Sequence, residues 1–463
     1  MVKRDRQKQK ELAPLDRIKT FEEVSCTFDD ETAVLEAQRC LQCKNAPCIK
    51  GCPVNINIPA FIKQLTLNDQ KGAIDIIRQS NNLPGVCGRV CPQEEQCEKN
   101  CLRKRVDGQA IAIGSLERYT ADYALEHFDD EVKVPQEKIG KAAVIGAGPA
   151  GLTAAADLAL GGVEVTVYEA FHKAGGVLIY GIPEFRLPKV LVQKEIDKVL
   201  KLGVKLELNT IVGKTITMDE ILQEYDAVFI GSGAGLPKFM GIEGENLNGV
   251  FSANEYLTRV NLMKAYDDQY DTPVWHGKKV AVLGGGNVAM DAARTALRLG
   301  AEEVFIVYRR SREEMPCRVE EAHHAEEEGV KFELLSQPIK ILGENGFVKG
   351  LECLKCELGE PDQSGRRRPK EIPNSNYVIE CDTVIVAIGT SPNPLLHRSY
   401  EALKTTEKGT LIVDENSMTT VQNVYAGGDA VTGAATVILA MGAGKKAAAE
   451  IIKTLKEKAN ASK

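Results

Sequence analysis

The sequence predicts an α/β protein in which a mostly helical N-terminal part precedes two Rossmann-like, dinucleotide-binding units. Three observations support this fold class. Eight of the 13 cysteines lie between residues 40 and 101, among segments with the apolar spacing of helices. Two patterns of strand, glycine turn and helix then begin near residues 141 and 278. At 463 residues, the chain is long enough for about three domains.

The composition is that of an ordinary acidic globular protein. The formal net charge of −7 gives no electrostatic argument for a nucleic-acid or membrane partner. The N-terminus, MVKRDRQKQKELAPLDR, lacks the apolar run of a secretory signal, and the apolar stretches end before the ~18 residues that a membrane span needs. We therefore expect a cytoplasmic protein whose clustered thiols serve metal or redox chemistry rather than disulfides.

The eight clustered cysteines form two blocks with spacing unlike that of zinc knuckles. The first block reads CLQCKNAPCIKGCP from residue 40, and the second reads CGRVCPQEEQCEKNC from residue 87. Structural zinc favours paired CxxC knuckles, but only one CxxC pair occurs here. A cysteine followed by proline at the end of a run is typical of bacterial ferredoxins, in which that cysteine ligates the other of two clusters. The spacing therefore favours two [4Fe–4S] clusters over zinc or unliganded thiols.

Helical patterns flank both cysteine blocks. The segment TFDDETAVLEAQRCLQC, capped by Asp29 or Asp30, is predicted to be a helix that delivers the first thiols. Residues 111–128 form a second helical pattern, which includes Glu117. The charged, proline-containing segment 129–141 predicts a linker. We therefore expect a helical cluster domain over about residues 1–135.

A first dinucleotide fingerprint follows the linker directly. An apolar strand leads into Gly146-x-Gly148-x-x-Gly151, then a helix of small residues and a second strand that ends at Glu169. The glycines allow a tight turn and close approach to a pyrophosphate, and the glutamate can accept hydrogen bonds from ribose hydroxyls. With strand, helix and acidic residue in register, a nucleotide site is favoured over a merely tight strand–helix turn.

The fingerprint recurs at Gly284-x-Gly286-x-x-Ala289, so we expect a second nucleotide. Here the second strand is followed by Arg309 and Arg310 instead of a carboxylate. Arginines suit a 2′-phosphate, which favours NADP(H) over NAD(H). The alternative is a solvated basic run at the end of a strand.

Three further segments each have the pattern of a strand that runs into a glycine turn. They span residues 225–235, residues 381–394 with Gly389, and residues 424–429 with Gly428 and Asp429. An alanine-rich helix follows the last turn, and its N-terminus is suited to the phosphate and ribityl groups of a flavin. Each pattern is weak by itself, because a surface turn has the same appearance.

The order of these motifs resembles the small (beta) subunit family of glutamate synthase over nearly the whole chain. The most specific pieces are GGVLIYGIPEFRLPK at 175–189 and YRRSREEMP at 308–316. GAGPAG, GGGNVAMD with Asn287, ELGEPDQSGRRRP and YAGGD complete the order. The chain is also similar to the NADPH-side subunit of ferredoxin-dependent transhydrogenases, the flavin subunit of some sulfide dehydrogenases and the N-terminal part of dihydropyrimidine dehydrogenase.

The resemblance implies how the cofactors are divided along the chain. A discontinuous FAD domain, about residues 136–260 and 383–463, would enclose an NADPH domain between them, residues 261–382. The resemblance adds Gly176, Arg186 and Asp429 to the FAD site, with Arg186 reaching a negatively charged part of FAD. A structural salt bridge is the alternative role for this arginine.

The resemblance also implies the cluster ligands. One cluster would bind Cys40, Cys43, Cys48 and Cys101, and the other Cys52, Cys91, Cys97 and Glu117. Cys87 would then be a spectator, although spacing alone assigns the eight cysteines as four plus four. Cys87→Ser should therefore retain both clusters, whereas Cys91→Ser should lose iron.

The expected function is electron input to a partner. NADPH gives up a hydride, FAD accepts two electrons and releases them singly, and clusters carry single electrons. We assign no acid–base residue, because hydride transfer needs only a nicotinamide stacked on the flavin with water excluded. The chain shows no N-terminal amidotransferase nucleophile and no FMN barrel, so glutamate formation would require a large subunit in a hetero-oligomer. The alternatives are a subunit of an electron-bifurcating transhydrogenase or sulfide dehydrogenase and, from another class, a non-catalytic electron-transfer or scaffold subunit.

The remaining candidate side chains are assigned structural roles. Cys353 and Cys356 have CxxC spacing, but their segment has the pattern of a strand, which would hold the thiols on opposite faces. The other isolated residues are expected to pack or to lie on a helix surface: Cys26, Cys317 and Cys381 as packing residues, and His323 and His324 on the surface.

Overall fold

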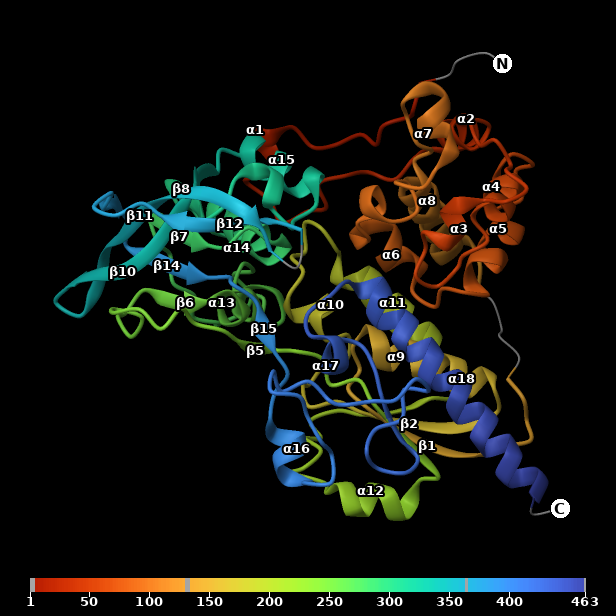
Figure 1. Ribbon diagram of the computed structural model, residues 1–463. Helices are drawn as coiled ribbons and strands as arrows, with labels where there is room; N and C mark the ends of the chain where they lie inside the picture. The colour runs from red at the N-terminus through yellow and green to blue at the C-terminus, as the bar shows by residue number, and fades with distance from the viewer. Residues whose placement is uncertain (1–4, 130–133, 363–364, 462–463) are drawn as a thin grey trace.

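The computed structural model describes residues 5–129, 134–362 and 365–461, which form three parts (Figure 1). A helical N-terminal part lies beside two α/β parts, each built on its own parallel five-stranded sheet. The predicted α/β fold class, with its N-terminal helical domain and two nested Rossmann-like domains, is therefore confirmed. None of the helices within the described residues combines the length and the apolar character that crossing a membrane requires.

The helical part consists of short helices joined by loops. They are α1 (Pro14–Arg17), α2 (Asp30–Ala37), α3 (Pro47–Lys50), α4 (Ile58–Leu65), α5 (Gln70–Arg78), α6 (Pro84–Val90), α7 (Leu102–Asp107) and α8 (Ile113–His127), with the 3-10 turn η1 (Gln93–Glu95). Helix α8 confirms the pattern predicted over residues 111–128, and its buried face packs against α5 and α6. The predicted linker includes residues 130–133, which lie outside the described residues.

Helix α2 differs from its prediction at the C-terminal end. The Asp29 carboxylate caps it by accepting a hydrogen bond from the Thr32 N–H at 2.8 Å, as a capping residue should. The helix ends at Ala37, however, so Cys40 and Cys43 lie in a loop beyond it. Gln42 has a left-handed φ of 49°, which turns the chain between these two thiols and is incompatible with a continued helix.

The first α/β part has the strand order β16–β4–β1–β2–β3. Its strands are β1 (Gly140–Ile145), β2 (Val163–Tyr168), β3 (Lys205–Glu207), β4 (Ala227–Ile230) and β16 (Val424–Ala426). The central strands are apolar throughout because helices cover both faces of a parallel sheet. Helices α9 (Pro149–Leu160), α11 (Lys189–Leu200) and α18 (Val437–Ala461) lie between this sheet and the helical part, whereas α12 (Met218–Glu224) lies on the opposite face (Figure 1).

The second α/β part has the strand order β6–β14–β7–β8–β9. Its strands are β6 (Val250–Ser252), β7 (Lys279–Leu283), β8 (Glu303–Tyr308), β9 (Lys331–Leu334) and β14 (Thr383–Val386). Helices α13 (Ala253–Asn261), α14 (Asn287–Arg298) and α15 (Val319–Glu327) belong to this part, as do β10 (Ser336–Glu344), β11 (Phe347–Pro361), β12 (Arg367–Glu371) and β13 (Tyr377–Glu380), which form an antiparallel sheet. Short helices elsewhere are α10 (Val177–Tyr180), α16 (Leu395–Ser399) and α17 (Asp429–Thr432).

The second part is inserted into the first, but its boundaries differ from those predicted. Strands β6 and β14 pair with each other, and β14 pairs with β7, so both belong to the second sheet. Placing the second part at residues 261–382 therefore omits one strand at each end. The chain crosses between the two parts at β5 (Leu236–Pro237) and β15 (Thr390–Ser391), which pair antiparallel. Strands as short as β6 and β14 give no periodic signal from which a boundary can be located.

One apolar core joins the helical part to the first α/β part. It runs without interruption from Phe61 and Ile74 in the helical part to Leu152 on α9 and Met441 on α18. The second α/β part has separate cores on the two sides of its sheet. The helical part and the first α/β part are therefore one packed body, which places the cysteine blocks directly against helices of the first nucleotide fold.

Candidate cofactor sites

Four cysteine thiols line one cavity in the helical part. Cys40, Cys43, Cys48 and Cys101 surround it together with apolar residues that include Ile58 and Ile113. Burial raises the pKa of Cys48 to about 12, and the nearby Cys101 and Cys40 thiols contribute to the rise. A thiol with so high a pKa is a poor free nucleophile. Cysteine sulfurs are the ligands that iron–sulfur clusters use, so the donor set fits a cluster. We call these four cysteines the outer set.

A second group of donors lies deeper. Cys52, Cys91, Cys97 and Glu117, which we call the inner set, are all buried. The Glu117 carboxylate on α8 accepts a hydrogen bond from the Asn81 amide at 2.7 Å, and burial raises its pKa to about 8. Burial also raises the pKa of Cys52 to about 11, and Glu117 and Cys91 lie near enough to add to this effect. The three thiols and the carboxylate therefore converge on one region, as the predicted ligand set requires.

Cys87 lies in the same region. Its thiol on α6 lies 3.7 Å from the Asn81 Oδ1 atom and 3.5 Å from the Met441 sulfur, and it is hydrogen-bonded to Cys91. The structure thus brings five potential ligands to a cluster that needs four. The choice of Glu117 over Cys87 stays a prediction.

The first glycine turn lies at the carboxyl end of β1. Gly146 has a φ of 100°, and a Cβ atom on Gly151 would lie only 1.8 Å from the Gly146 carbonyl oxygen. Gly148 is the N-cap of α9, so the first N–H groups of this helix face the turn. The backbone therefore has the close strand–helix approach that a dinucleotide fingerprint requires.

Glu169 follows β2, as predicted. Its buried carboxylate accepts hydrogen bonds from the backbone N–H groups of Ala147 and Phe171 at 2.8 and 2.9 Å. Burial raises the pKa of Glu169, and the two N–H groups oppose that rise. The carboxylate therefore fixes the glycine turn against the end of β2, and its contact with a ribose stays a prediction.

Two more turns approach the start of α9. Gly176 has a φ of 55°, and a Cβ atom there would lie 2.9 Å from the Cα atom of Gly148. Gly428 has a φ of 66°, and its Cβ would lie 3.0 Å from the Ala150 Cβ. Asp429 follows, and burial raises its pKa to about 6. The three turns surround one helix N-terminus, the arrangement expected for a bound pyrophosphate.

The second glycine turn repeats this geometry. The structure places Gly284, Gly286, Asn287, Ala289 and Gly389 beyond the carboxyl ends of β7 and β14. Gly284 has a φ of 140°, and a Cβ atom on it would lie 2.4 Å from the Ala387 carbonyl oxygen. Gly286 is the N-cap of α14. The Asn287 side chain accepts a hydrogen bond from the Arg318 N–H at 2.9 Å, which holds the start of α15 beside the turn.

The two arginines after β8 have different environments. Arg310 is 6% exposed and donates to the Asp362 carboxylate at 2.7 Å and to the Arg367 carbonyl at 2.8 Å. Arg309 is exposed and has no ion pair within the described residues. Arg310 therefore ties the end of β8 to the β11–β12 hairpin, while the Arg309 guanidinium is accessible to a ligand. The predicted pair thus divides into one structural and one accessible arginine.

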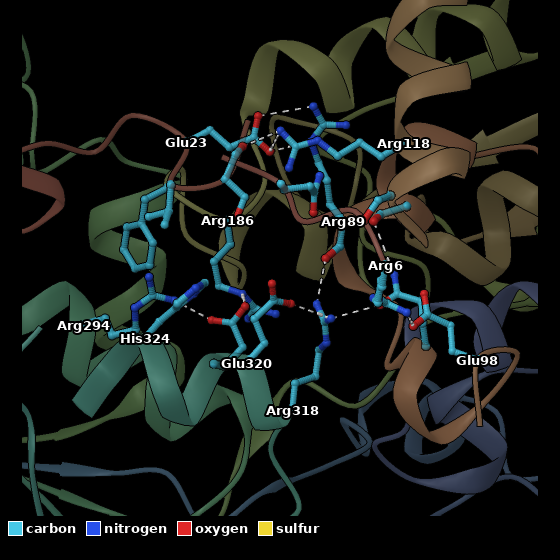
Figure 2. A pocket seen from close by; sticks show the side chains of 18 residues that line it. Arg6, Glu23, Arg89, Glu98, Arg118, Arg186, Arg294, Arg318, Glu320 and His324 are labelled. Atoms are coloured by element: carbon cyan, nitrogen blue, oxygen red, sulfur yellow. Dashed lines mark hydrogen bonds and ion pairs between the residues drawn. The ribbon is translucent and has the colours of Figure 1, made fainter. Parts of the chain in front are cut away.

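Arg186 lies where the three parts of the molecule meet (Figure 2). Its guanidinium pairs with Asp291 at 2.7 Å and with Glu321 at 2.8 Å, both in the second α/β part. Burial lowers its pKa, but these two carboxylates outweigh that effect and raise it. The structure shows the salt bridge that was the alternative for Arg186, and a contact with FAD stays a prediction.

The pocket around Arg186 is a paired polar junction. Figure 2 shows arginines and glutamates from all three parts pointing into one space. Each further arginine is in an ion pair with a carboxylate: Arg6 with Glu98, Arg89 with Glu23, Arg118 with Glu23, Arg294 with Glu321, and Arg318 with Glu320. The N-terminal segment adds Val24, whose N–H donates to the Phe185 carbonyl at 3.0 Å. No sequence spacing links these distant partners, so the junction was not predicted.

The structure tests the roles predicted for the isolated histidines and cysteines. His324 is not a surface residue: it is 4% exposed, and its ring contacts the Glu11 carboxylate at 3.1 Å, whereas His323 is exposed as predicted. Cys26 is exposed rather than packed. Cys353 and Cys356 lie on strand β11, as predicted, and both are buried free thiols. Cys381 is buried and Cys317 is half-buried.

Comparison with known proteins agrees with this division of the chain. Residues 17–128 match the family described as dihydropyrimidine dehydrogenase domain II, 4Fe-4S cluster, and residues 140–444 match the pyridine nucleotide-disulphide oxidoreductase family. FprA from Mycobacterium tuberculosis, in complex with NADPH, superimposes with a TM-score of 0.57 at 21% identity over 70% of this chain and 85% of FprA. At this identity the likeness shows a shared fold.

Two curated relatives are closer in sequence. The beta subunit of an NADP(+)-dependent formate dehydrogenase from Moorella thermoacetica is 41% identical over 437 residues, which are 89% of this chain. The chain spans 60% of the length of that relative. The small chain of NADPH glutamate synthase from Azospirillum brasilense is 38% identical over 453 residues, which are 96% of this chain and 94% of that one. From these matches, the chain belongs to the glutamate synthase small (beta) subunit family of NADPH-dependent FAD and iron–sulfur oxidoreductases.

Proposed function

We propose that the chain is the electron-input subunit of a larger enzyme. Electrons would pass from NADPH to FAD, to two [4Fe–4S] clusters and then to a partner subunit that makes glutamate from glutamine and 2-oxoglutarate. When bound, these cofactors supply hydride donation, exchange of an electron pair for single electrons, and single-electron transfer. The chain itself binds and aligns them.

The main support for this proposal is the position of the inner set beside helix α18 of the first nucleotide fold. Cys87, beside that set, contacts Met441 on α18 at 3.5 Å. Helix α18 begins at Val437, close after the turn of Gly428 and Asp429. No residue of α18 is among those that line the cavity of the outer set, and Cys40, Cys43 and Cys101 are half-buried rather than buried. This difference in burial supports an order in which electrons pass from the first nucleotide fold to the inner set and then to the outer set.

The residues of the second α/β part support NADPH as the donor. Arg309 is the accessible cation at the end of β8, where a 2′-phosphate is recognised in such folds. Asp291 and Glu321 join this part to Arg186 of the first part, which fixes the two nucleotide units relative to each other. The roles of these residues are to bind, orient and exclude water, and no proton-transferring side chain is needed for the hydride step.

A partner of another kind is the second candidate. The relatives include beta subunits named for NADP(+)-dependent formate dehydrogenase and for NADPH-Fe(3+) oxidoreductase, so members of this sequence group are associated with different reactions. A subunit of an electron-bifurcating transhydrogenase or of a sulfide dehydrogenase belongs to the same class. A scaffold subunit with intact cofactors would instead fail to oxidise NADPH.

Purification of the native complex without oxygen tests the proposed partner. We expect a large subunit with an amidotransferase domain to co-purify, and the complex to form glutamate from glutamine and 2-oxoglutarate at the expense of NADPH. A partner that binds NAD(H) and reduces ferredoxin would contradict glutamate synthesis and favour the transhydrogenase. NADPH oxidation by the isolated chain with ferricyanide separates both enzymes from the scaffold alternative.

A further inference from the structure

The segments that carry the outer set are basic. Residues 38–52 and 99–106 hold the four cysteines and contain no aspartate or glutamate, in a chain with a net charge of −7. Their seven basic residues are Arg39, Lys44, Lys50, Lys99, Arg103, Lys104 and Arg105. The two segments that hold the outer set thus differ in charge from the protein as a whole.

Only some of these basic side chains have internal partners. Arg39 and Arg103 are buried and pair with Glu36 and Asp107 at 2.6 Å, and the exposed Lys99 pairs with Glu95 at 2.7 Å. The remaining four are exposed and have no ion pair within the described residues: Lys44, Lys50, Lys104 and Arg105. We call these four residues the basic rim. Cations without an internal partner are available to a charged partner.

An exposed apolar residue lies within the basic rim. Val106 on α7 is 64% exposed, directly after Lys104 and Arg105. Leu102 of the same helix and Leu41 are half-buried and line the cavity of the outer set. An apolar centre with a polar rim is the usual composition of a protein–protein interface. Helix α7 lies at the end of the helical part that is farthest from α9 and α18 (Figure 1).

We propose that the basic rim, together with Val106, is the docking surface for an acidic redox protein or subunit that receives electrons from the outer set. The inference rests on the proposed electron path, because that path makes the outer set the point of exit. A positive face on a negatively charged protein orients an acidic partner and repels a basic one. The chemistry that recognises the partner is therefore a carboxylate-rich surface around a one-electron centre.

A binding experiment tests the docking surface independently of electron transfer. The probe is zinc-substituted rubredoxin, a small acidic redox protein made redox-inactive by its metal, titrated into the iron-loaded chain. We expect saturable binding whose dissociation constant rises about tenfold or more between 50 and 500 mM salt, because salt screens the charges. The triple variant Lys44→Glu, Lys104→Glu and Arg105→Glu should weaken binding at least tenfold.

A matched triple variant controls for the total charge. Lys214, Lys408 and Lys456 are exposed, have no ion pair within the described residues and lie in the first α/β part. Changing all three to glutamate alters the net charge equally and should leave rubredoxin binding within about twofold. If the basic-rim variant loses iron, the milder pair Lys104→Gln and Arg105→Gln replaces it and should weaken binding about threefold. Basic cytochrome c should show no saturable binding to the wild-type chain.

Two results would overturn the docking surface. One is equal binding of rubredoxin by the wild-type and basic-rim variants, both with full iron. The other is a shifted cluster reduction potential in the variant without any change in binding, which would mean that the rim only compensates cluster charge. Reduction of the flavin and clusters by NADPH distinguishes these results from failure of the proposed function: it should be unchanged in the basic-rim variant, and its absence in the wild type would contradict the electron path itself.

Discussion

The two nucleotide units share a backbone plan and differ in the residues that end their second strands. In both, a glycine with positive φ follows a buried strand, and another glycine caps the next helix. After β2, however, the buried Glu169 accepts two backbone N–H groups, whereas after β8 the exposed Arg309 has no ion pair in the described residues. The shared glycines therefore account for the repeated backbone plan, and we propose that the residues that end the second strands account for the choice of nucleotide.

The largest expected effect comes from the third position of each fingerprint. In the first unit, a Cβ atom on Gly151 would lie 1.8 Å from the Gly146 carbonyl oxygen, so Gly151→Ala must displace α9 or the turn. We expect the variant to lose most of its FAD and to be destabilised by about 3 kcal/mol. The second unit already has alanine there, so Ala289→Gly should cost only about 1 kcal/mol. Flavin content and thermal unfolding measure the two effects in each variant. Equal losses in Gly151→Ala and Ala289→Gly would contradict a steric difference between the two fingerprints.

Removing the carboxylate at the end of β2 should have the next largest effect. Glu169→Ala leaves the Ala147 and Phe171 N–H groups without their acceptor, which costs about 1–3 kcal/mol. We expect FAD to bind about 10- to 100-fold more weakly, as measured by fluorescence titration of the flavin-free protein. Glu169→Gln retains one acceptor oxygen and should lose less. An unchanged affinity in Glu169→Ala would mean that the carboxylate does not hold the turn.

Arg309 should set the preference for NADPH in the second unit. Arg309→Ala should lower kcat/KM for NADPH about tenfold or more and leave that for NADH unchanged, because a charge-assisted contact to the 2′-phosphate is lost. Arg310→Ala should instead loosen the β11–β12 hairpin through the loss of its Asp362 pair and lower stability. The measurement is steady-state oxidation of both nucleotides with ferricyanide. An unchanged ratio of NADPH to NADH efficiency in Arg309→Ala would refute its role.

The smallest expected effect concerns the junction of the two units. Lys189 is half-buried, and the desolvation of its ammonium group lowers its pKa to about 7. Between about pH 7 and 10 the unfolded chain binds a proton that the folded chain does not, so the free energy of unfolding should rise with pH. We expect the melting temperature to rise by a few degrees between pH 7 and 9, relative to Lys189→Met. Parallel pH profiles for the two proteins would show that Lys189 is charged when folded.

The local patterns were predictable from the sequence, and the contacts between distant segments were not. The strand–turn–helix signals of both fingerprints and the helix that carries Glu117 follow from spacing alone. The pairing of Arg186 with Asp291 joins residues 105 positions apart, and that of Arg310 with Asp362 joins residues 52 apart. Arginine after a strand gives the same signal whether a ligand or a carboxylate binds it. Only the tertiary fold separates Arg309 from Arg310, or buries His324 while leaving His323 exposed.

One anaerobic titration tests the central claim, that electrons pass from NADPH in the second unit through FAD in the first to the clusters. The purified chain is analysed for iron, sulfide and flavin, and NADPH is then added while flavin and cluster absorbance are recorded together. We predict about eight irons and one FAD per chain, with both chromophores bleached by NADPH. Iron and flavin that are both present but not reduced by NADPH, or zinc in place of iron, would contradict the account.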